Sequence, residues 1–373
     1  MRITAVIHSL HGGGAERVMA NLVSRLAARG HQVTLITLDD GANDRHAVSR
    51  AVARVHVDSG RQTAGRIARM FTAGKRLAGL RRAIRQTAPE VVLSFCDETN
   101  VSTLLATFGL TIPVVVSERS DPAAQRLTPG KAWLRRRLYR RAAEVVVLTP
   151  AAAETVAPWI RRSPVVIPSA VDLPLEEESE AGAELDGEAR RGGRKTIIGV
   201  GRLEPEKGFD LLLEAFARLE ADFPGWDLEI HGDGSQLESL RKGCHRSGLS
   251  ERVRWPGWTR PIWPALRAAD LFVLPSRYEG FPSALLEAMA VGLPCVATDC
   301  PSGPRAIIRH SLDGLLVPPN DPAALATAMG RCMADEDERD RLGEQARAVV
   351  TRFGWEALVD AYVAVLERAA GSS

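Results

Sequence analysis

The sequence predicts an α/β protein built from two doubly wound parallel sheets. Short apolar runs typical of buried strands alternate with longer helical segments, and this alternation starts again at residue 196 after an acidic, glycine-rich stretch. A chain of 373 residues is long enough for two domains, each with its own core. We therefore expect domains at 1–170 and 196–350, an exposed segment near the linker at 171–195, and a C-terminal helix within 351–373 that crosses the boundary between the domains.

The individual elements follow from these apolar runs. In the first half, helical segments such as 15–29 and 66–85 lie between the strands, and in the second half a long helix is predicted at 355–369. The expected strands are 3–7, 33–38, 91–95, 113–117, 145–148 and 164–167, followed by 196–200, 227–230, 271–274 and 295–298.

Composition restricts the class of protein. No apolar stretch approaches the ~18 residues of a membrane-spanning helix, and the first residues lack a signal-peptide cleavage site. The five cysteines are odd in number and form no tight ligand cluster, so we expect reduced thiols, a cytoplasmic protein and no metal site.

The net charge of +2 hides an asymmetry between the two halves. Residues 1–170 hold 25 Lys and Arg against 12 Asp and Glu, a balance of +13, and the remainder carries −11. The first half is thus expected to face an anionic partner: nucleic acid, an acidic membrane or a phosphorylated substrate. No nucleic-acid motif is present and aromatics do not interleave with the basic residues, so we expect no nucleic-acid partner.

Two carboxylates stand out in the stretch EGFPSALLEAMAVGLP, residues 279–294. Glu279 lies in a turn after the 271–274 strand, at the strand end where open α/β sheets bind ligands. Glu287 lies four residues after Ser283, on the same face of the helix that begins there, and the start of that helix suits a phosphate. Without its neighbours the pair would equally suit a turn residue and a solvated helix residue. The flanking Gly280, Phe281, Pro282 and Ser283 favour a functional site.

Three further loops follow predicted strands. Arg202 and Lys207 flank a turn after the 196–200 strand, and their cationic groups suit a diphosphate, although two surface cations are the alternative. Gly232 follows the next strand and would let backbone approach a ligand, although a simple turn explains it equally well. In the first half, Gly13 and Gly14 follow the first strand and open a helix without forming the GxGxxG dinucleotide signature.

With these motifs in place, the chain resembles the retaining glycosyltransferases of family four, which have the GT-B fold. The resemblance spans nearly the whole chain and rests on GGGAERV, GRLEPEKGFDLLLEAF, GDGSQLESL, ADLFVLPSRYEGFPSALLEAMAVGLPCVAT and SGPRAII. It implies two Rossmann-like domains facing a central cleft, and no cofactor other than a nucleotide-sugar co-substrate, which the resemblance favours as a UDP-sugar.

The resemblance also implies roles for the residues of the second half. Glu287 would hold the ribose of the nucleotide-sugar and Glu279 would contact the transferred sugar. Arg202 and Lys207 would bind the diphosphate and neutralise its charge as it leaves, without a metal ion. The remaining donor-binding residues would be Gly280, Phe281, Pro282, Ser283, Gly232 and Gly14.

Two stretches, SFCDETN (94–100) and VSERSDP (116–122), are similar to a branch that extends polyprenyl-diphosphate-linked oligosaccharides and includes N-acetylgalactosamine transferases. Arg119 stands near the position where many members have a histidine, which leaves a catalytic histidine unassigned. The basic segments 61–85 and 131–141 suit a lipid diphosphate and an anionic bilayer, and solvated arginine-rich helices are the alternative. The resemblance thus implies a protein on the inner face of the cell membrane. Its expected acceptor-binding residues are Gly13, Asp97, Glu118, Arg119, Arg69 and Arg76.

Other functions remain open at this point. A transferase with a soluble acceptor is expected to show no membrane association. A catalytically silent nucleotide-sugar-binding subunit is expected to lack Arg202, Lys207 or one of the two glutamates, and all four are present. An NAD-dependent oxidoreductase is expected to carry the dinucleotide signature that Gly13 and Gly14 do not complete.

Overall fold

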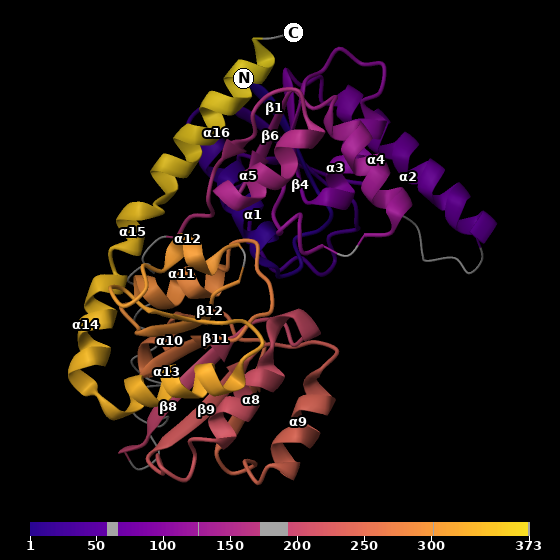
Figure 1. Cartoon of the computed structure of the whole chain (residues 1–373). Coiled ribbons are helices and arrows are strands. Elements are labelled where there is room, and N and C mark those ends of the chain that lie inside the picture. Colours follow the sequence, from indigo (N-terminus) through magenta and orange to yellow (C-terminus); the bar gives the residue numbers. More distant parts are fainter. Residues whose placement is uncertain (58–65, 126, 172–192, 301, 372–373) are drawn as a thin grey trace. The chain divides into compact units, whose positions relative to one another are not determined.

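A computed structural model describes residues 1–57, 66–125, 127–171, 193–300 and 302–371 (Figure 1); for 66–71 it describes the helix but not the side chains. The chain divides into two compact units. The first comprises Met1–Ser169 and Glu356–Ser373, and the second comprises Ala170–Trp355.

The first unit contains a seven-stranded parallel sheet in the order β3-β2-β1-β4-β5-β6-β7. Its central strands are rich in Val and Ile and are buried on both faces, as expected where helices cover both sides of a parallel sheet. The strands are β1 (Arg2–Ile7), β2 (Gln32–Thr37), β3 (Ala53–His56), β4 (Val91–Phe95), β5 (Val114–Ser117), β6 (Glu144–Val147) and β7 (Val165–Val166).

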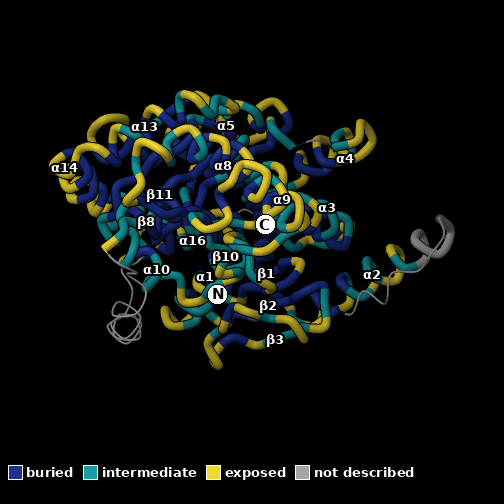
Figure 2. Tube along the Cα trace, turned by 90° about the horizontal axis from the view of Figure 1, so that it is seen from below, coloured by how far each residue is buried: buried dark blue, intermediate teal, exposed yellow. Residues whose placement is uncertain are grey.

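The helices of this unit bury apolar residues against the sheet. In Figures 1 and 2 the N-terminal part of α2 extends away from the sheet, which agrees with the burial of Leu80, Ala83 and Ile84 in its C-terminal half. The helices are α1 (Gly14–Ala28), α2 (Arg66–Gln86), α3 (Asp97–Ala106), α4 (Pro129–Tyr139), α5 (Pro150–Val156), the 3-10 turn η1 (Ala157–Trp159) and α16 (Trp355–Ala370).

The second unit contains a six-stranded parallel sheet in the order β10-β9-β8-β11-β12-β13. A buried core of aliphatic and aromatic residues lies between this sheet and its helices. The strands are β8 (Lys195–Val200), β9 (Trp226–His231), β10 (Val253–Gly257), β11 (Leu271–Leu274), β12 (Cys295–Thr298) and β13 (Leu315–Val317). The helices are η3 (Pro205–Lys207), α8 (Phe209–Ala217), α9 (Leu237–Arg246), α10 (Trp263–Ala268), α11 (Ser283–Ala290), α12 (Pro304–Ile307), α13 (Pro322–Ala334), α14 (Glu336–Ala346) and α15 (Val349–Arg352).

The predicted fold of two doubly wound α/β domains is confirmed, and each of the ten predicted strands is present. Three strands were not predicted: β3, β10 and β13. β3 and β10 are sheet-edge strands in which, apart from the buried Val253 of β10, the residues are exposed or half-buried. β13, at the far edge of the second sheet, has only three residues.

Two expectations fall partly or wholly outside the described residues. The segment 171–195 is described only at its two ends, and the side chain of Arg69 is not described. The helix predicted at 355–369 is present as α16, and its expected position across the domain boundary stays a prediction. Within the described part of the chain, no helix combines the length and apolar character needed to span a bilayer.

Candidate functional site

Each sheet has one position where the strand order reverses. In the second unit it lies between β8 and β11, and in the first between β1 and β4. The loops that leave the carboxyl ends of such neighbouring strands diverge, and open α/β sheets bind ligands in the space between them. In the second unit these two loops carry the predicted catalytic residues: Arg202 and Lys207 follow β8, and Glu279 follows β11.

Lys207 and Glu279 form an ion pair. Nζ of Lys207 lies 2.7 Å from Oε1 of Glu279, whose side chain is only 7% exposed. The hydroxyl of Ser276 donates to the same oxygen at 2.7 Å. One lysine proton points to the glutamate, so two N–H groups of Lys207 are left for other acceptors. The structure thus brings together two residues that lie 72 positions apart in the sequence.

Arg202 has a different environment. Its side chain is 69% exposed, and its Nη2 lies 3.3 Å from Oε1 of Glu206, which is 21% exposed, on the same loop. Solvent screens the charge of an arginine this exposed, so the pair holds it weakly. Arg202 can therefore turn toward an anion at the end of β8.

The backbone of these loops is closely packed. A Cβ on Gly232 would lie 1.8 Å from the carbonyl oxygen of Gly201, and the φ of Gly232 is +146°. A Cβ on Gly208 would lie 2.2 Å from the carbonyl oxygen of Pro275, with φ at +66°. Both positions therefore require glycine. For Gly232 this close partner is protein backbone, and the donor-binding role suggested by the sequence stays a prediction beside the simple turn.

The start of α11 completes this part of the site. Pro282 is the N-cap residue, and Ser283 begins the helix with its first amides facing the carboxyl end of the sheet. Phe281 is buried and packs edge-on against Phe353 at 5.3 Å between ring centroids. The hydroxyl of Ser302 donates to the carbonyl oxygen of Gly280 at 3.3 Å, which fixes the turn before the helix. Glu287 is 5% exposed, so it is not the solvated helix residue that its sequence alone would equally suit.

In the first unit, Gly13, Gly14 and Asp97 lie at the corresponding reversal. Gly13 is the N-cap of α1 after β1, Gly14 is the first residue of that helix, and Asp97 is the first residue of α3 after β4. Arg76 reaches the same edge of the sheet from α2, where its Nη2 donates to the carbonyl oxygen of Leu38 at 3.3 Å.

Glu118 occupies a position that the sequence does not predict. It has no exposed surface, accepts a hydrogen bond from the hydroxyl of Tyr139, and lies 3.6 Å from Arg135. Burial raises the pKa of Glu118 to about 7, against the opposing effects of Arg135 and Tyr139. Its Oε2 has no hydrogen-bond partner among the described residues, and the acceptor role predicted for Glu118 stays a prediction.

Arg119 also makes contacts within the first unit. Its guanidinium lies 4.9 Å from the ring centroid of Phe95 and donates to the hydroxyl of Ser169 at 2.7 Å. A weaker contact of 3.5 Å reaches the hydroxyl of Tyr362 on α16. The acceptor role predicted for Arg119 stays a prediction.

The basic segment 131–141 forms most of α4 and the turn after it. Arg135 is buried, with its guanidinium 4.7 Å from the ring centroid of Trp159, so this cation does not contribute to a basic surface. The other cations of the segment are exposed, and Trp133 beside them is 66% exposed. We call this surface the α4 basic face; it consists of Lys131, Trp133, Arg136, Arg137, Arg140 and Arg141.

Comparison with known protein families covers most of the chain. Residues 13–170 match the glycosyl transferase 4-like domain, and residues 183–349 match the glycosyl transferases group 1. This chain belongs to the group 1 glycosyltransferases. The GT-B fold predicted from the sequence is confirmed by solved structures. The glycosyltransferase aligns along its full length with sucrose-phosphate synthase from Thermosynechococcus elongatus, at a TM-score of 0.84, 22% identity and 99% coverage of that chain.

A second solved structure is Anabaena HepE in complex with UDP and glucose. It matches at a TM-score of 0.81 and 20% identity, over 98% of the glycosyltransferase and 99% of HepE. At this identity both solved structures inform on the fold alone.

Curated relatives add polysaccharide-synthesising enzymes. The lipopolysaccharide core biosynthesis glycosyltransferase LpsE of Rhizobium meliloti is 29% identical over 98% of this chain and 99% of its own. A Campylobacter jejuni N-acetylgalactosaminyltransferase, named for an undecaprenol-diphosphate-linked acceptor, is 26% identical over 93% of each chain. An exopolysaccharide phosphotransferase of Streptomyces coelicolor is 45% identical, but over 44% of this chain and only 18% of its own length.

The sequence did not single out the residues that connect the loops after β8, β9 and β11. Glu204 accepts hydrogen bonds from the backbone N–H and the hydroxyl of Ser235, which lower its pKa and join the loops after β8 and β9. Arg277 joins the loops after β8 and β11. No local sequence pattern predicts these contacts, because the partners lie 31 to 72 residues apart.

Proposed function

We propose that this glycosyltransferase moves a hexose or N-acetylhexosamine from a UDP-sugar to a saccharide linked to a polyprenyl diphosphate, with retention of anomeric configuration. The observation that carries the proposal is the Lys207–Glu279 pair at the strand-order reversal of the second sheet, beside the start of α11. This arrangement offers cations and helix amides for a diphosphate and a buried carboxylate for a sugar hydroxyl.

The proposed reaction needs no metal ion. The bond between the anomeric carbon and the diphosphate oxygen breaks, and its electron pair leaves with the diphosphate. Lys207, Arg202 and the amides at the start of α11 neutralise that charge. The acceptor hydroxyl oxygen bonds to the anomeric carbon on the same face, and its proton passes to the departing phosphate oxygen. Within the described residues, no group of three or more His, Cys, Asp or Glu is placed to hold a metal ion.

The choice of a lipid-linked acceptor rests on two features of the first unit. Arg76 reaches the carboxyl edge of the sheet, where a diphosphate would need a cation. The α4 basic face combines exposed cations with an exposed tryptophan, which suits an anionic bilayer surface. The name of the Campylobacter relative supports the same acceptor class.

The first experiment is a thermal-shift screen of the purified protein against UDP, GDP, ADP and their common sugar conjugates. A donor that binds the folded state raises the melting temperature by mass action. We expect the largest shift with UDP-N-acetylhexosamines. A shift with GDP- or ADP-sugars instead would overturn the nucleotide assignment, and no shift with any of them would favour a catalytically silent subunit.

The second experiment tests the reaction itself. UDP-N-acetylgalactosamine is incubated with a short polyprenyl-diphosphate-linked saccharide, and proton NMR determines the anomeric configuration of the new linkage. An α-linked product from the α-linked donor supports retention, and a β-linked product contradicts it. Equal transfer to the same saccharide without its lipid would favour a soluble acceptor.

A further inference from the structure

The loop that carries Lys207 touches the loop that carries Glu279 at several points. Gly208 approaches the carbonyl oxygen of Pro275 so closely that a Cβ would collide with it. The backbone N–H of Arg277 donates to the carbonyl oxygen of Glu206 at 2.8 Å. These contacts lie on either side of Lys207 in the sequence.

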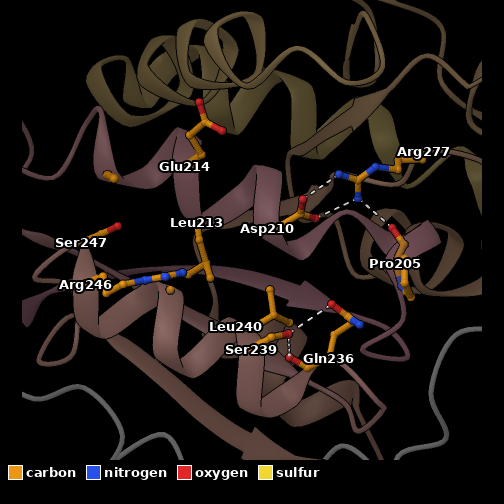
Figure 3. A pocket seen from close by; sticks show the side chains of 12 residues that line it. Pro205, Asp210, Leu213, Glu214, Gln236, Ser239, Leu240, Arg246, Ser247 and Arg277 are labelled. Atoms are coloured by element: carbon orange, nitrogen blue, oxygen red, sulfur yellow. Dashed lines mark hydrogen bonds and ion pairs between the residues drawn. The ribbon is translucent and has the colours of Figure 1, made fainter.

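The side chain of Arg277 adds a third contact, shown in Figure 3. Its Nη1 donates to the carbonyl oxygen of Pro205 at 2.7 Å and to Oδ1 of Asp210 at 2.8 Å, and its Nη2 donates to Oδ2 of Asp210 at 2.6 Å. One guanidinium therefore holds both ends of the short segment 205–210, with Lys207 between them. Only arginine provides this planar set of donors, because a lysine ammonium has no fork to match a carboxylate.

We propose that Arg277 and Asp210 form a positioning pair that keeps Lys207 aligned with Glu279. The proposal rests on the proposed function, since it assigns Lys207 to the leaving diphosphate. Asp210 and Arg277 also line a pocket of about 460 Å³ between α8 and α9, together with Leu213, Gln236 and Ser239 among others.

The geometry distinguishes this role from ordinary surface stabilisation. The side chains of Arg277 and Asp210 are 31% and 56% exposed, and exposed ion pairs contribute little to the stability of a fold. The hydrogen bonds to Asp210 nevertheless lower its pKa, which shows that the carboxylate form is favoured in this place. A pair that adds little stability but fixes a loop next to a reacting group is expected to act mainly on turnover.

The expected effect is on the rate more than on binding. Charge on the diphosphate grows as the glycosidic bond breaks, so a displaced Lys207 loses more stabilisation in the transition state than in the bound ground state. A misplacement of about 1 Å costs up to roughly 100-fold in rate.

The test uses Arg277→Lys and Asp210→Asn in the full-length protein. The control is Arg194→Lys, because Arg194 also makes a two-bond contact with an aspartate, Asp227, at 2.9 and 2.7 Å, and is similarly exposed at 35%. Arg194 immediately precedes β8 and Asp227 lies at the start of β9. Their pair is therefore at the amino ends of these strands, whereas Arg277 and Asp210 lie in segments that follow carboxyl ends.

Three quantities are measured: the Kd for UDP by calorimetry, and kcat and KM for release of UDP from UDP-N-acetylgalactosamine. We expect both test variants to lower kcat by about 10- to 100-fold while Kd and KM change less than about threefold. The Arg194→Lys control keeps wild-type kcat. Wild-type kcat in Arg277→Lys, or an equal loss in the control, overturns the proposal.

Hydrogen exchange provides a readout that does not depend on activity. Peptides covering 204–211 and 275–282 are expected to exchange faster in Arg277→Lys than in the wild type, and unchanged exchange overturns the proposal. If the wild type neither binds UDP nor turns over the UDP-sugar, the proposed function fails, and the exchange result alone decides whether Arg277 holds the two loops together.

The double variant Arg277→Lys with Asp210→Asn tests whether the two residues act as a pair. We expect its kcat to match that of the worse single variant, because both changes remove the same contact. Losses that multiply instead would show that the two residues act independently, which contradicts the proposal.

Discussion

Nζ of Lys207 lies 2.7 Å from Oε1 of Glu279 and joins the loop after β8 to the loop after β11. The glutamate is nearly buried and also accepts a hydrogen bond from Ser276, so its orientation is fixed by two donors. A lysine held in this way has lost much of its rotamer freedom before a ligand arrives, which lowers the entropic cost of binding a phosphate. The pair therefore holds a cation and a carboxylate side by side before a ligand binds.

Replacing Lys207 by alanine tests whether this positioned cation contributes to turnover. We expect Lys207→Ala to lower kcat for UDP release by roughly 100- to 1000-fold, the usual cost of removing a group that stabilises transition-state charge. The control is Lys195→Ala, since Lys195 forms a surface pair with Glu336 at the amino end of β8, whereas Lys207 lies in the loop after the carboxyl end of that strand. Wild-type turnover in Lys207→Ala would contradict the donor-site assignment.

Gly232 makes a second prediction possible. A Cβ there would meet the carbonyl oxygen of Gly201, and backbone on both sides has little room to move. We expect Gly232→Ala to destabilise the second unit by roughly 1–3 kcal/mol and to weaken UDP binding, because the displaced Gly201 precedes Arg202. Thermal unfolding and calorimetry measure the two effects.

Gly243 provides the matched control. It lies inside α9 with an ordinary φ, and a Cβ there would meet nothing within 4 Å. Alanine is a better helix former than glycine, so Gly243→Ala is expected to raise stability by about 0.5–1 kcal/mol. Equal destabilisation by both changes would show that the close approach of Gly232 to Gly201 has no special importance.

The sequence predicted what depends on local patterns. Runs such as Val91–Phe95 and Leu271–Leu274 are apolar because both faces of a central parallel strand are buried, so each run indicates a strand by itself. β3 has only half-buried and exposed residues, and β10 includes Pro256, so neither has that signature. The loops that carry Lys207 and Glu279 were found because each directly follows a predictable strand.

The sequence did not predict what depends on contacts between distant segments. The sequence around Glu118 does not indicate that this residue is buried against Tyr139 and Arg135, which come from a helix 17 to 21 positions later. The sequence of the same helix also does not indicate which of its cations is buried. One buried glutamate requires one buried arginine, and a motif comparison carries no information about that pairing.

Glu118 leads to a prediction about pH. Its pKa of about 7 in the folded protein exceeds the ordinary value of 4.5, because burial disfavours the charged form. Between these values the folded chain holds a proton that the unfolded chain releases, so this glutamate makes the protein less stable as pH rises from 4.5 to 7.

Replacing the carboxylate by an uncharged amide should remove this dependence. We expect the midpoint of thermal unfolding of Glu118→Gln to equal or fall below that of the wild type near pH 5 and to gain on it steadily up to pH 8. A shift of one pKa unit corresponds to about 1.4 kcal/mol, so the relative gain is on the order of 1–3 kcal/mol. A difference between the two proteins that is constant from pH 5 to 8 would show that Glu118 does not titrate in this window.

The α4 basic face leads to a prediction about membranes. Arg137 and Arg140 are exposed, as is Trp133 on the same helix, and the segment 122–143 contains no acidic residue. A cluster of this kind attracts anionic lipid, and each basic residue near the surface adds to the affinity.

We expect the protein to sediment with vesicles that contain phosphatidylglycerol, and Arg137→Glu with Arg140→Glu to weaken that binding by at least about tenfold. The control is Arg218→Glu with Arg241→Glu, which makes the same change in net charge on α8 and α9 of the second unit. Because the attraction is electrostatic, binding should also fall as salt rises from 50 to 500 mM, since the screening length drops below about 10 Å once salt exceeds roughly 100 mM. Equal losses in both double variants would attribute the binding to net charge alone and would leave α4 without a specific part in it.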